Sequence, residues 1–167
     1  MKNENKVFKQ IEEKNLNIEN IKQRVDIWKS QKQTIAFTNG CFDWLHRGHI
    51  YSLTMASQYA DRLVLGLNSD ASVKRLKGEK RPINSEQNRA LLLASFSFID
   101  AVVIFENDTP LELIKKIEPD VLVKGGDYKI ENIVGADVVL QNGGKVVTTE
   151  LLADFSTTKL LQKIGYE

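Results

Sequence analysis

Short apolar runs alternate along the chain with longer stretches in which apolar residues recur at helical spacing. The short runs predict β-strands at residues 34–38, 63–67, 101–105, 121–123 and 145–149. The longer stretches predict helices at residues 18–28, 48–59, 85–96, 110–118, 132–141 and 156–164. Because the strands are apolar on both faces and alternate with helices, we expect an α/β fold, a parallel sheet with helices on both faces.

The segments between these elements carry turn and cap signals. Ser85 is expected to cap the helix that follows it, and Asp108 or Thr109 is expected to cap the helix that Pro110 enters at its first turn. Residues 68–83 form a long polar stretch that we expect to be a loop. Loops of that length inside a compact domain are often functional.

The amino-terminal part of the chain differs from the rest. Its first 17 residues are polar, and the first few are expected to fray. We therefore expect residues 1–33 to be a helical extension and residues 34–167 to be the main domain. One helical face of the extension is apolar, and packing on its own domain is favoured over a contact with another chain. That face consists of Ile18, Ile21, Val25 and Trp28.

Composition excludes several classes of protein. Of the 167 residues 42% are hydrophobic and 27% charged, as is usual for a globular protein, and the net charge of +1 gives no global sign of a nucleic-acid or membrane partner. Cys41 is the only cysteine, which excludes an internal disulfide and a cysteine-based zinc site. The amino terminus has no apolar signal-peptide core, and the apolar runs fall far short of the roughly 20 residues that span a bilayer. We expect a cytoplasmic protein.

The strongest chemical signal is the segment TNGCFDWLHRGH at residues 38–49. It follows the first main-domain strand and opens a helix, and ligands of parallel α/β sheets bind at such strand ends. Gly48 permits close backbone approach, and free amides at a helix amino terminus attract phosphate. His46 and His49 could donate hydrogen bonds to a phosphate during displacement. A single histidine at such a position is more often a polar residue whose hydrogen bonds are satisfied, but both of the chain's histidines lie in this block. A zinc site is disfavoured, because no third ligand lies at the usual spacing.

This segment resembles the signature of the cytidylyltransferase-like nucleotidyltransferases, whose hallmark is an HxGH motif. A second family element resembles Ser156-Thr157-Thr158-Lys159, and the likeness runs from about residue 34 to residue 164. The resemblance implies a Rossmann-like sheet. It also implies transfer of a nucleoside monophosphate from an NTP to a phosphorylated small molecule, with release of pyrophosphate.

Within that family, four segments are most similar to the D-glycero-β-D-manno-heptose 1-phosphate adenylyltransferases: FTNGCFDWLHRGH, LNSDASVKRLKGEKRPIN, VLVKGGDY and DFSTTKL. The likeness implies transfer of AMP from ATP to a heptose 1-phosphate, giving ADP-heptose for lipopolysaccharide core synthesis. In that branch the domain is often joined to a heptose kinase, and a separate kinase is expected here. The likeness also implies Mg²⁺ carried mainly by ATP, and a homodimer.

Two alternatives stay open. One is a CTP-dependent transferase for glycerol 3-phosphate or another phospho-alcohol. In the glycerol-phosphate branch the C-terminal element begins with Arg-Thr-Glu-Gly, whereas residues 151–154 here are LLAD, so the arginine is absent and its replacement is unidentified. The other is a non-catalytic nucleotide-binding module. Neither G-x-x-x-x-G-K-[ST] nor G-x-G-x-x-G occurs, which disfavours a P-loop kinase or a dehydrogenase.

The resemblance also implies roles for individual residues. His46, His49 and Lys77 are expected to be catalytic, and Asp43, Asn68 and Asp70 to bind the sugar phosphate. No residue is expected to ligate a metal. The expected nucleotide-binding residues are Thr38, Gly40, Cys41, Phe42, Gly48, Arg89, Lys124, Gly125, Asp127, Ser156, Thr157 and Thr158.

Each of these roles has a plainer alternative. The cations at residues 74–81, which include Lys77, suit a mobile cover over a triphosphate but also suit a solvated loop. Arg89 could form a surface salt bridge, and Asp43 could be a turn residue. Residues 124–128, KGGDY, could pack against a base or sugar or form a plain glycine turn, and Ser156 could be an ordinary helix cap.

Overall fold

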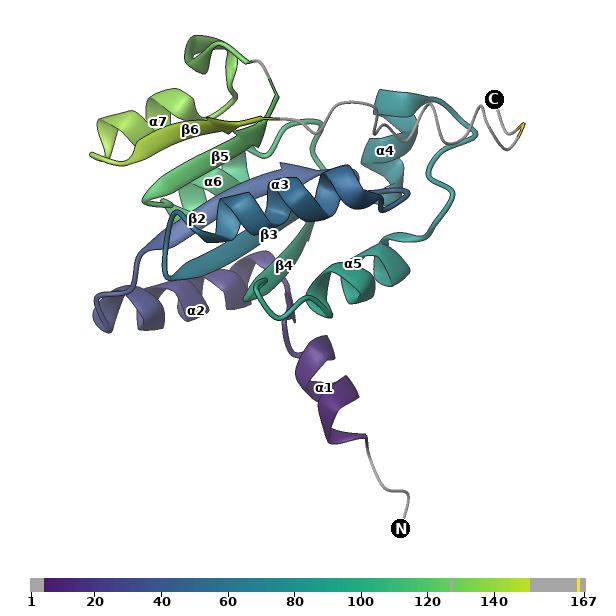
Figure 1. Cartoon of the computed structure of the whole chain (residues 1–167), viewed down its shortest axis with the longest axis horizontal. Coiled ribbons are helices and arrows are strands. Elements are labelled where there is room, and N and C mark those ends of the chain that lie inside the picture. Colours follow the sequence, from purple (N-terminus) through teal and green to yellow (C-terminus); the bar gives the residue numbers. More distant parts are fainter. Residues whose placement is uncertain (1–4, 127, 151–164, 166–167) are drawn as a thin grey trace.

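The computed structural model describes residues 5–126, 128–150 and 165. Its centre is a six-stranded sheet in the order β1-β4-β3-β2-β5-β6, in which every pairing is parallel (Figure 1). The predicted α/β class with a parallel sheet is confirmed. The strands are β1 (Asn15–Leu16), β2 (Ile35–Gly40), β3 (Arg62–Asn68), β4 (Ala101–Phe105), β5 (Val121–Gly125) and β6 (Lys145–Thr149).

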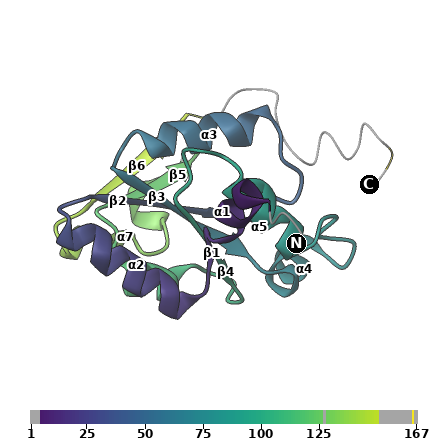
Figure 2. The ribbon, with the colours of Figure 1, turned by 90° about the horizontal axis from the view of Figure 1, so that it is seen from below.

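Helices cover both faces of this sheet, and Figure 2 shows α2 and α3 on opposite sides of it. The helices are α1 (Lys6–Glu12), α2 (Ile18–Ser30), α3 (Arg47–Ser57), α4 (Asp70–Lys77), α5 (Glu86–Ala94), α6 (Leu111–Ile117) and α7 (Ala136–Gln141), with a 3₁₀ turn at Ile130–Asn132. No helix in the described part of the chain is both long and apolar enough to cross a lipid bilayer.

Strand order creates a topological switch point at the carboxyl edge of the sheet. From β2 the chain proceeds to β3 and β4 on one side, and then returns to place β5 and β6 on the other side of β2. The direction of winding therefore reverses between β2 and β5. Such a topological switch point is where open α/β sheets bind ligands.

Two apolar cores lie on the two faces of the sheet. The side chains of Ile35 and Phe37 join the core beneath α2, α6 and α7, whereas Ala36 joins the core beneath α3 and α5. Alternation along β2 is what a strand buried on both faces requires. The two cores hold the strand ends in fixed positions relative to one another.

The amino-terminal segment is built into this architecture. Ile21, Val25 and Trp28 of α2 are buried in the first core, and β1 extends the sheet beside β4. The apolar helical face predicted at residues 18–28 therefore packs on its own domain. Neither β1 nor α1 was expected, because residues 1–17 carry too few apolar positions to show a period.

Three local expectations were wrong. Residues 68–83 are not all loop, because α4 forms there behind the Ser69 cap, whose side chain accepts from the amide of Ser72. Pro110 itself occupies the cap position of α6, so neither Asp108 nor Thr109 caps that helix. The helix expected from residue 132 begins at Ala136, after Gly135 in the left-handed conformation. The expected helix at residues 156–164 lies outside the described residues.

Candidate active site

The loop between β2 and α3 is shaped by Gly40 and Phe42. Phe42 has a φ of 45°, and this unusual backbone turns its ring over Gly40. A methyl group at Gly40 would lie 2.9 Å from Cε2 of that ring, so only glycine fits without displacement. The Phe42 ring then meets the His49 imidazole edge to face, with centroids 5.3 Å apart. The glycine in this loop thus helps to place a histidine.

His46 and His49 stack on each other at the start of α3. Their ring centroids are 3.8 Å apart and their planes differ by 26°. His46 is the cap residue of α3, in extended conformation, and its carbonyl accepts from the amides of His49 and Ile50. Nδ1 of His49 is buried and has no hydrogen-bond partner among the described residues. An unsatisfied buried nitrogen beside a helix amino terminus is suited to a ligand.

The surroundings of both imidazoles favour the neutral form. Burial lowers the pKa of His46, and burial together with the neighbouring His46 lowers the pKa of His49 to about 4. A neutral imidazole offers one N–H donor and one acceptor. A bound polyphosphate would oppose the effect of burial, because a nearby anion favours the protonated ring. The pair can therefore respond to negative charge on a ligand.

Cationic side chains converge on the first turn after β2. Burial raises the pKa of the Cys41 thiol, while the charges of Lys77, Arg89 and Arg81 oppose that rise and Asp43 adds to it. Lys77 lies in the exposed last turn of α4. The charge of Lys77 acts on Cys41, in the loop that leads to the histidine motif, and its role toward phosphate stays a prediction.

Lys124 links β5 to β2. Its Nζ donates to Oδ1 of Asn39 over 3.2 Å, and burial lowers its pKa. Gly125 ends β5 beside it. Asn39 was not among the predicted residues, and its only signal was its position between Thr38 and Gly40 at a strand end. Asp127 lies outside the described residues.

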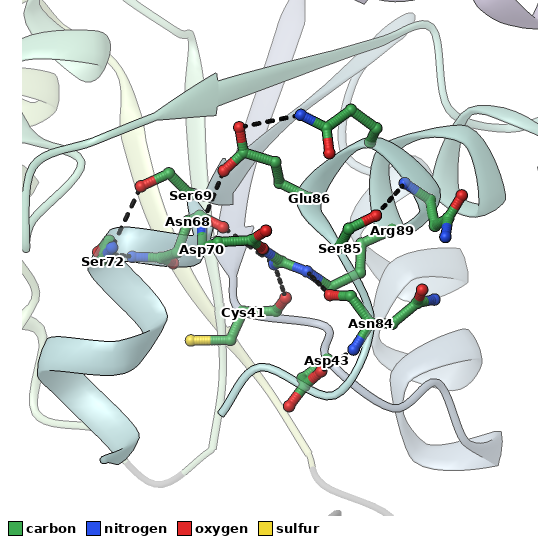
Figure 3. Close-up of polar contacts among 12 residues, drawn as sticks. Cys41, Asp43, Asn68, Ser69, Asp70, Ser72, Asn84, Ser85, Glu86 and Arg89 are labelled. Carbon is green, nitrogen blue, oxygen red and sulfur yellow. Dashed lines mark hydrogen bonds and ion pairs between the residues drawn. The ribbon is translucent and has the colours of Figure 1, made fainter. Parts of the chain in front are cut away.

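Arg89 is a buried hub at the carboxyl edge of the sheet (Figure 3). Its side chain is completely buried, so the alternative of a surface salt bridge is wrong. Its four hydrogen bonds go to the carbonyl oxygens of Asn84, Cys41 and Asn68 and to Oδ1 of Asp70. A guanidinium carries five N–H groups, so at most one, on Nη2, is left for the expected nucleotide contact.

Asp43 holds a loop rather than facing the strand ends. Its carboxylate is 1% exposed and pairs with Nε of Arg81 over 2.6 Å. The amides of Ile83 and Asn84 also donate to it, over 2.7 and 3.1 Å. In this structure three protein donors occupy its oxygens, and its predicted contact with the sugar phosphate stays a prediction.

The other two expected sugar-phosphate residues differ in exposure. Asn68 is buried, and its Nδ2 donates to Oγ of Ser72. Asp70 keeps 37% of its side chain exposed while it pairs with Arg89. Of the three, Asp70 is the one whose side chain is not buried.

The remaining expected residues follow the strand and helix ends. Thr38 is buried within β2, and Gly48 is buried in the first turn of α3. Gly40, Cys41 and Gly125 lie at the switch point. Ser156, Thr157 and Thr158 lie outside the described residues. Within the described ranges no three His, Cys, Asp or Glu side chains form a group that could hold a metal ion.

These features define an α/β protein with a stacked histidine pair and converging cations at its topological switch point. Solved structures share the fold. Pantothenate synthetase from Thermus thermophilus aligns with a TM-score of 0.61 at 15% identity, covering 88% of this chain and 67% of that one. A lipopolysaccharide core biosynthesis protein from Thermoplasma volcanium aligns with a TM-score of 0.57 at 24% identity, covering 72% of this chain and 97% of that one.

Comparison with known sequences shows the family to which this chain belongs. A family model described as Cytidylyltransferase-like matches residues 37–163. The chain is 54% identical over 147 residues to the bifunctional protein HldE of Nitrobacter hamburgensis, covering 88% of this chain and 30% of that protein. It is 55% identical over 141 residues to HldE of Caulobacter vibrioides, covering 84% of this chain and 29% of that protein. The chain thus spans less than a third of the length of these relatives. It belongs to the cytidylyltransferase-like family and is a nucleotidyltransferase.

Proposed function

We propose that this chain transfers AMP from ATP to D-glycero-β-D-manno-heptose 1-phosphate, giving ADP-heptose and pyrophosphate. The single observation that carries the proposal is the stacked pair of His46 and His49 at the amino terminus of α3. The likeness of four segments to the heptose 1-phosphate adenylyltransferases supports the choice of substrates. The identity to HldE proteins adds to that support.

The proposed step is a direct displacement at phosphorus. An oxygen of the sugar 1-phosphate attacks the α-phosphorus of ATP, the bond from that phosphorus to the bridging oxygen breaks, and pyrophosphate leaves with the electron pair. No covalent enzyme intermediate forms, so the protein contributes position and charge stabilisation. In this scheme N–H groups of His46 and His49 donate to oxygens that gain negative charge, and Lys77 neutralises the triphosphate.

The protein side chains near the strand ends do not fit a metal cage. Asp43 and Asp70 are each paired with an arginine, Asp43 with Arg81 and Asp70 with Arg89. Mg²⁺ prefers oxygen ligands and usually keeps several waters. In this proposal Mg²⁺ therefore arrives with ATP, bound to phosphate oxygens and water, and no step depends on a protein ligand to it.

A panel of substrates tests the proposal. The four NTPs are paired with heptose 1-phosphate, other sugar 1-phosphates and glycerol 3-phosphate, and pyrophosphate release is measured. ATP with heptose 1-phosphate is expected to give the highest kcat/KM. Faster turnover of CTP with glycerol 3-phosphate would favour the alternative transferase. Saturable ATP binding without turnover of any acceptor would favour a non-catalytic module.

We further propose that the protein acts in the cytoplasm as a homodimer, without nucleic-acid or membrane partners. The family likeness supports the dimer. The apolar face of α2 is buried within its own domain, so a dimer would use another surface.

A further inference from the structure

The segment between β3 and α5 is fastened at both of its ends. This segment, residues 69–85, contains α4 and is termed the α4 arm. It carries Lys77, which is exposed. Each end of the arm meets an aspartate–arginine pair in which one or both side chains are buried. The composition of this segment predicted a mobile cover over a triphosphate. Such a cover would need at least one end that is not fastened.

The first attachment lies at the start of α4. Arg89 pairs with Asp70 over 2.7 Å, and the amide of Asp70 donates to Oε2 of Glu86 over 2.7 Å. The same guanidinium binds the carbonyls of Cys41 and Asn68. The amino end of the arm is thereby tied to the loop that leads to the histidine motif, to the end of β3 and to α5 (Figure 3).

The second attachment lies beyond the end of α4. Asp43, which stands three residues before His46, accepts from Arg81, Ile83 and Asn84. Both side chains of the Asp43–Arg81 pair are buried, at 1% and 7% exposure. Removing two charges from water is costly, so a buried ion pair adds little net stability, but it fixes geometry because its hydrogen bonds are directional.

We propose that Asp43 and Arg89 are positioning residues that fix the α4 arm, and with it Lys77, relative to His46 and His49. The inference rests on the proposed function, because it takes Lys77 to act on the triphosphate. Lys77 sits between the two attachments, and its charge acts on the thiol of Cys41, within the loop that both attachments grip. The backbone that carries Lys77 is therefore fastened before substrate binds, which reduces the cost of ordering this segment during the reaction.

A double-mutant cycle tests whether Asp43 acts through Lys77. Asp43→Asn is expected to lower kcat on the order of 10- to 100-fold in the otherwise unchanged protein, the scale of a small misplacement. In a Lys77→Ala background the same substitution is expected to lower kcat less than about 3-fold, because the group it positions is gone. Losses that multiply would overturn the proposal, as would wild-type kcat in Lys77→Ala alone.

Arg89 is tested in the same way through Asp70→Asn. This variant removes the negative charge that pairs with Arg89 and leaves the three backbone contacts of Arg89 in place, so it spares the fold better than a substitution of the buried arginine. Its loss of kcat is also expected to shrink in the Lys77→Ala background. The matched control is Asp100→Asn, which breaks the Arg62–Asp100 pair at the opposite end of β3. Its effect on kcat is expected to be small and independent of Lys77.

Amide hydrogen exchange gives a readout that needs no acceptor substrate. Amides of residues 70–83 are expected to exchange at least about 10-fold faster in Asp43→Asn and Asp70→Asn than in the unchanged protein, whereas Asp100→Asn leaves them protected. Unchanged exchange in both arm variants would overturn the proposal. If no sugar 1-phosphate supports turnover, the proposed function fails, and the anchoring of the arm is decided by exchange alone.

Discussion

The imidazole of His49 lies between two rings, stacked on His46 with centroids 3.8 Å apart and met edge-on by Phe42 at 5.3 Å. These contacts desolvate the ring and limit its rotation while they leave its buried Nδ1 without a partner among the described residues. A polar atom that is oriented yet unsatisfied is characteristic of a site prepared for a ligand. The predictions below follow from this arrangement.

Replacing either histidine is expected to remove most of the activity without unfolding the protein. His46→Ala and His49→Ala should each lower kcat by about 10²–10³-fold, the usual cost of one charge-stabilising donor. If the donors act in the transition state, ATP affinity should change much less than kcat. Steady-state kinetics, ATP titration and thermal melting measure the three quantities. Gln58→Ala, on the exposed end of α3, is the control. A stable histidine variant with nearly unchanged kcat would remove that residue from the mechanism.

Acid should weaken the fold through His49. Its pKa is about 4 in the folded protein and near 6.5 when unfolded, so between these values the unfolded chain binds a proton that the native state does not. The contribution of His49 to stability is therefore complete above pH 6.5 and is lost as pH falls toward 4. Urea unfolding of the unchanged protein and of His49→Gln across this range gives the difference. The variant is expected to lose less stability on acidification, and parallel curves would contradict the account.

A methyl group at position 40 should disturb the histidine pair from a distance. Gly40→Ala would place Cβ 2.9 Å from the Phe42 ring, so the ring must move and its contact with His49 is lost. We expect a loss of about 1–3 kcal/mol in the free energy of unfolding, as for other overpacked sites, and a lower kcat. Adding Phe42→Leu should recover part of the stability by making room. No recovery in the double variant would show that the strain lies elsewhere.

The proposed homodimer is tested by measuring the molar mass of the protein in solution. Multi-angle light scattering at micromolar concentration should give twice the 18.9 kDa of one chain. A monomer mass across the concentration range would refute the dimer.

The sheet was predictable from local pattern. The run AVVIF marked β4 at Ala101–Phe105 without error, and Ser85 caps α5 as its position before that helix indicated. In each case the signal lies within a few neighbouring residues. The helix α4 was missed because Val73 is its only buried apolar side chain and its remaining signals are charged residues.

Of the candidate site, only the histidine motif was predictable from the sequence. The histidine pair was readable because HxGH is contiguous and sits between a strand and a helix. The roles of Asp43 and Arg89 were not readable, because their partners Arg81 and Asp70 lie 38 and 19 residues away. The sequence alone identified Arg89 as a cation and Asp43 as an anion, without their partners. Which charges face a ligand and which pair with each other depends on the folded contacts.

The fate of a labelled phosphate tests the central claim, nucleotidyl transfer at the histidine pair, most directly. The enzyme is incubated with heptose 1-phosphate and ATP labelled at either the α- or the γ-phosphorus, and the products are separated. The account predicts that the α-label appears in the ADP-sugar and the γ-label in pyrophosphate, and that both transfers fall together in His46→Ala and His49→Ala. Appearance of the γ-label in the sugar product, or undiminished transfer in both variants, would contradict it.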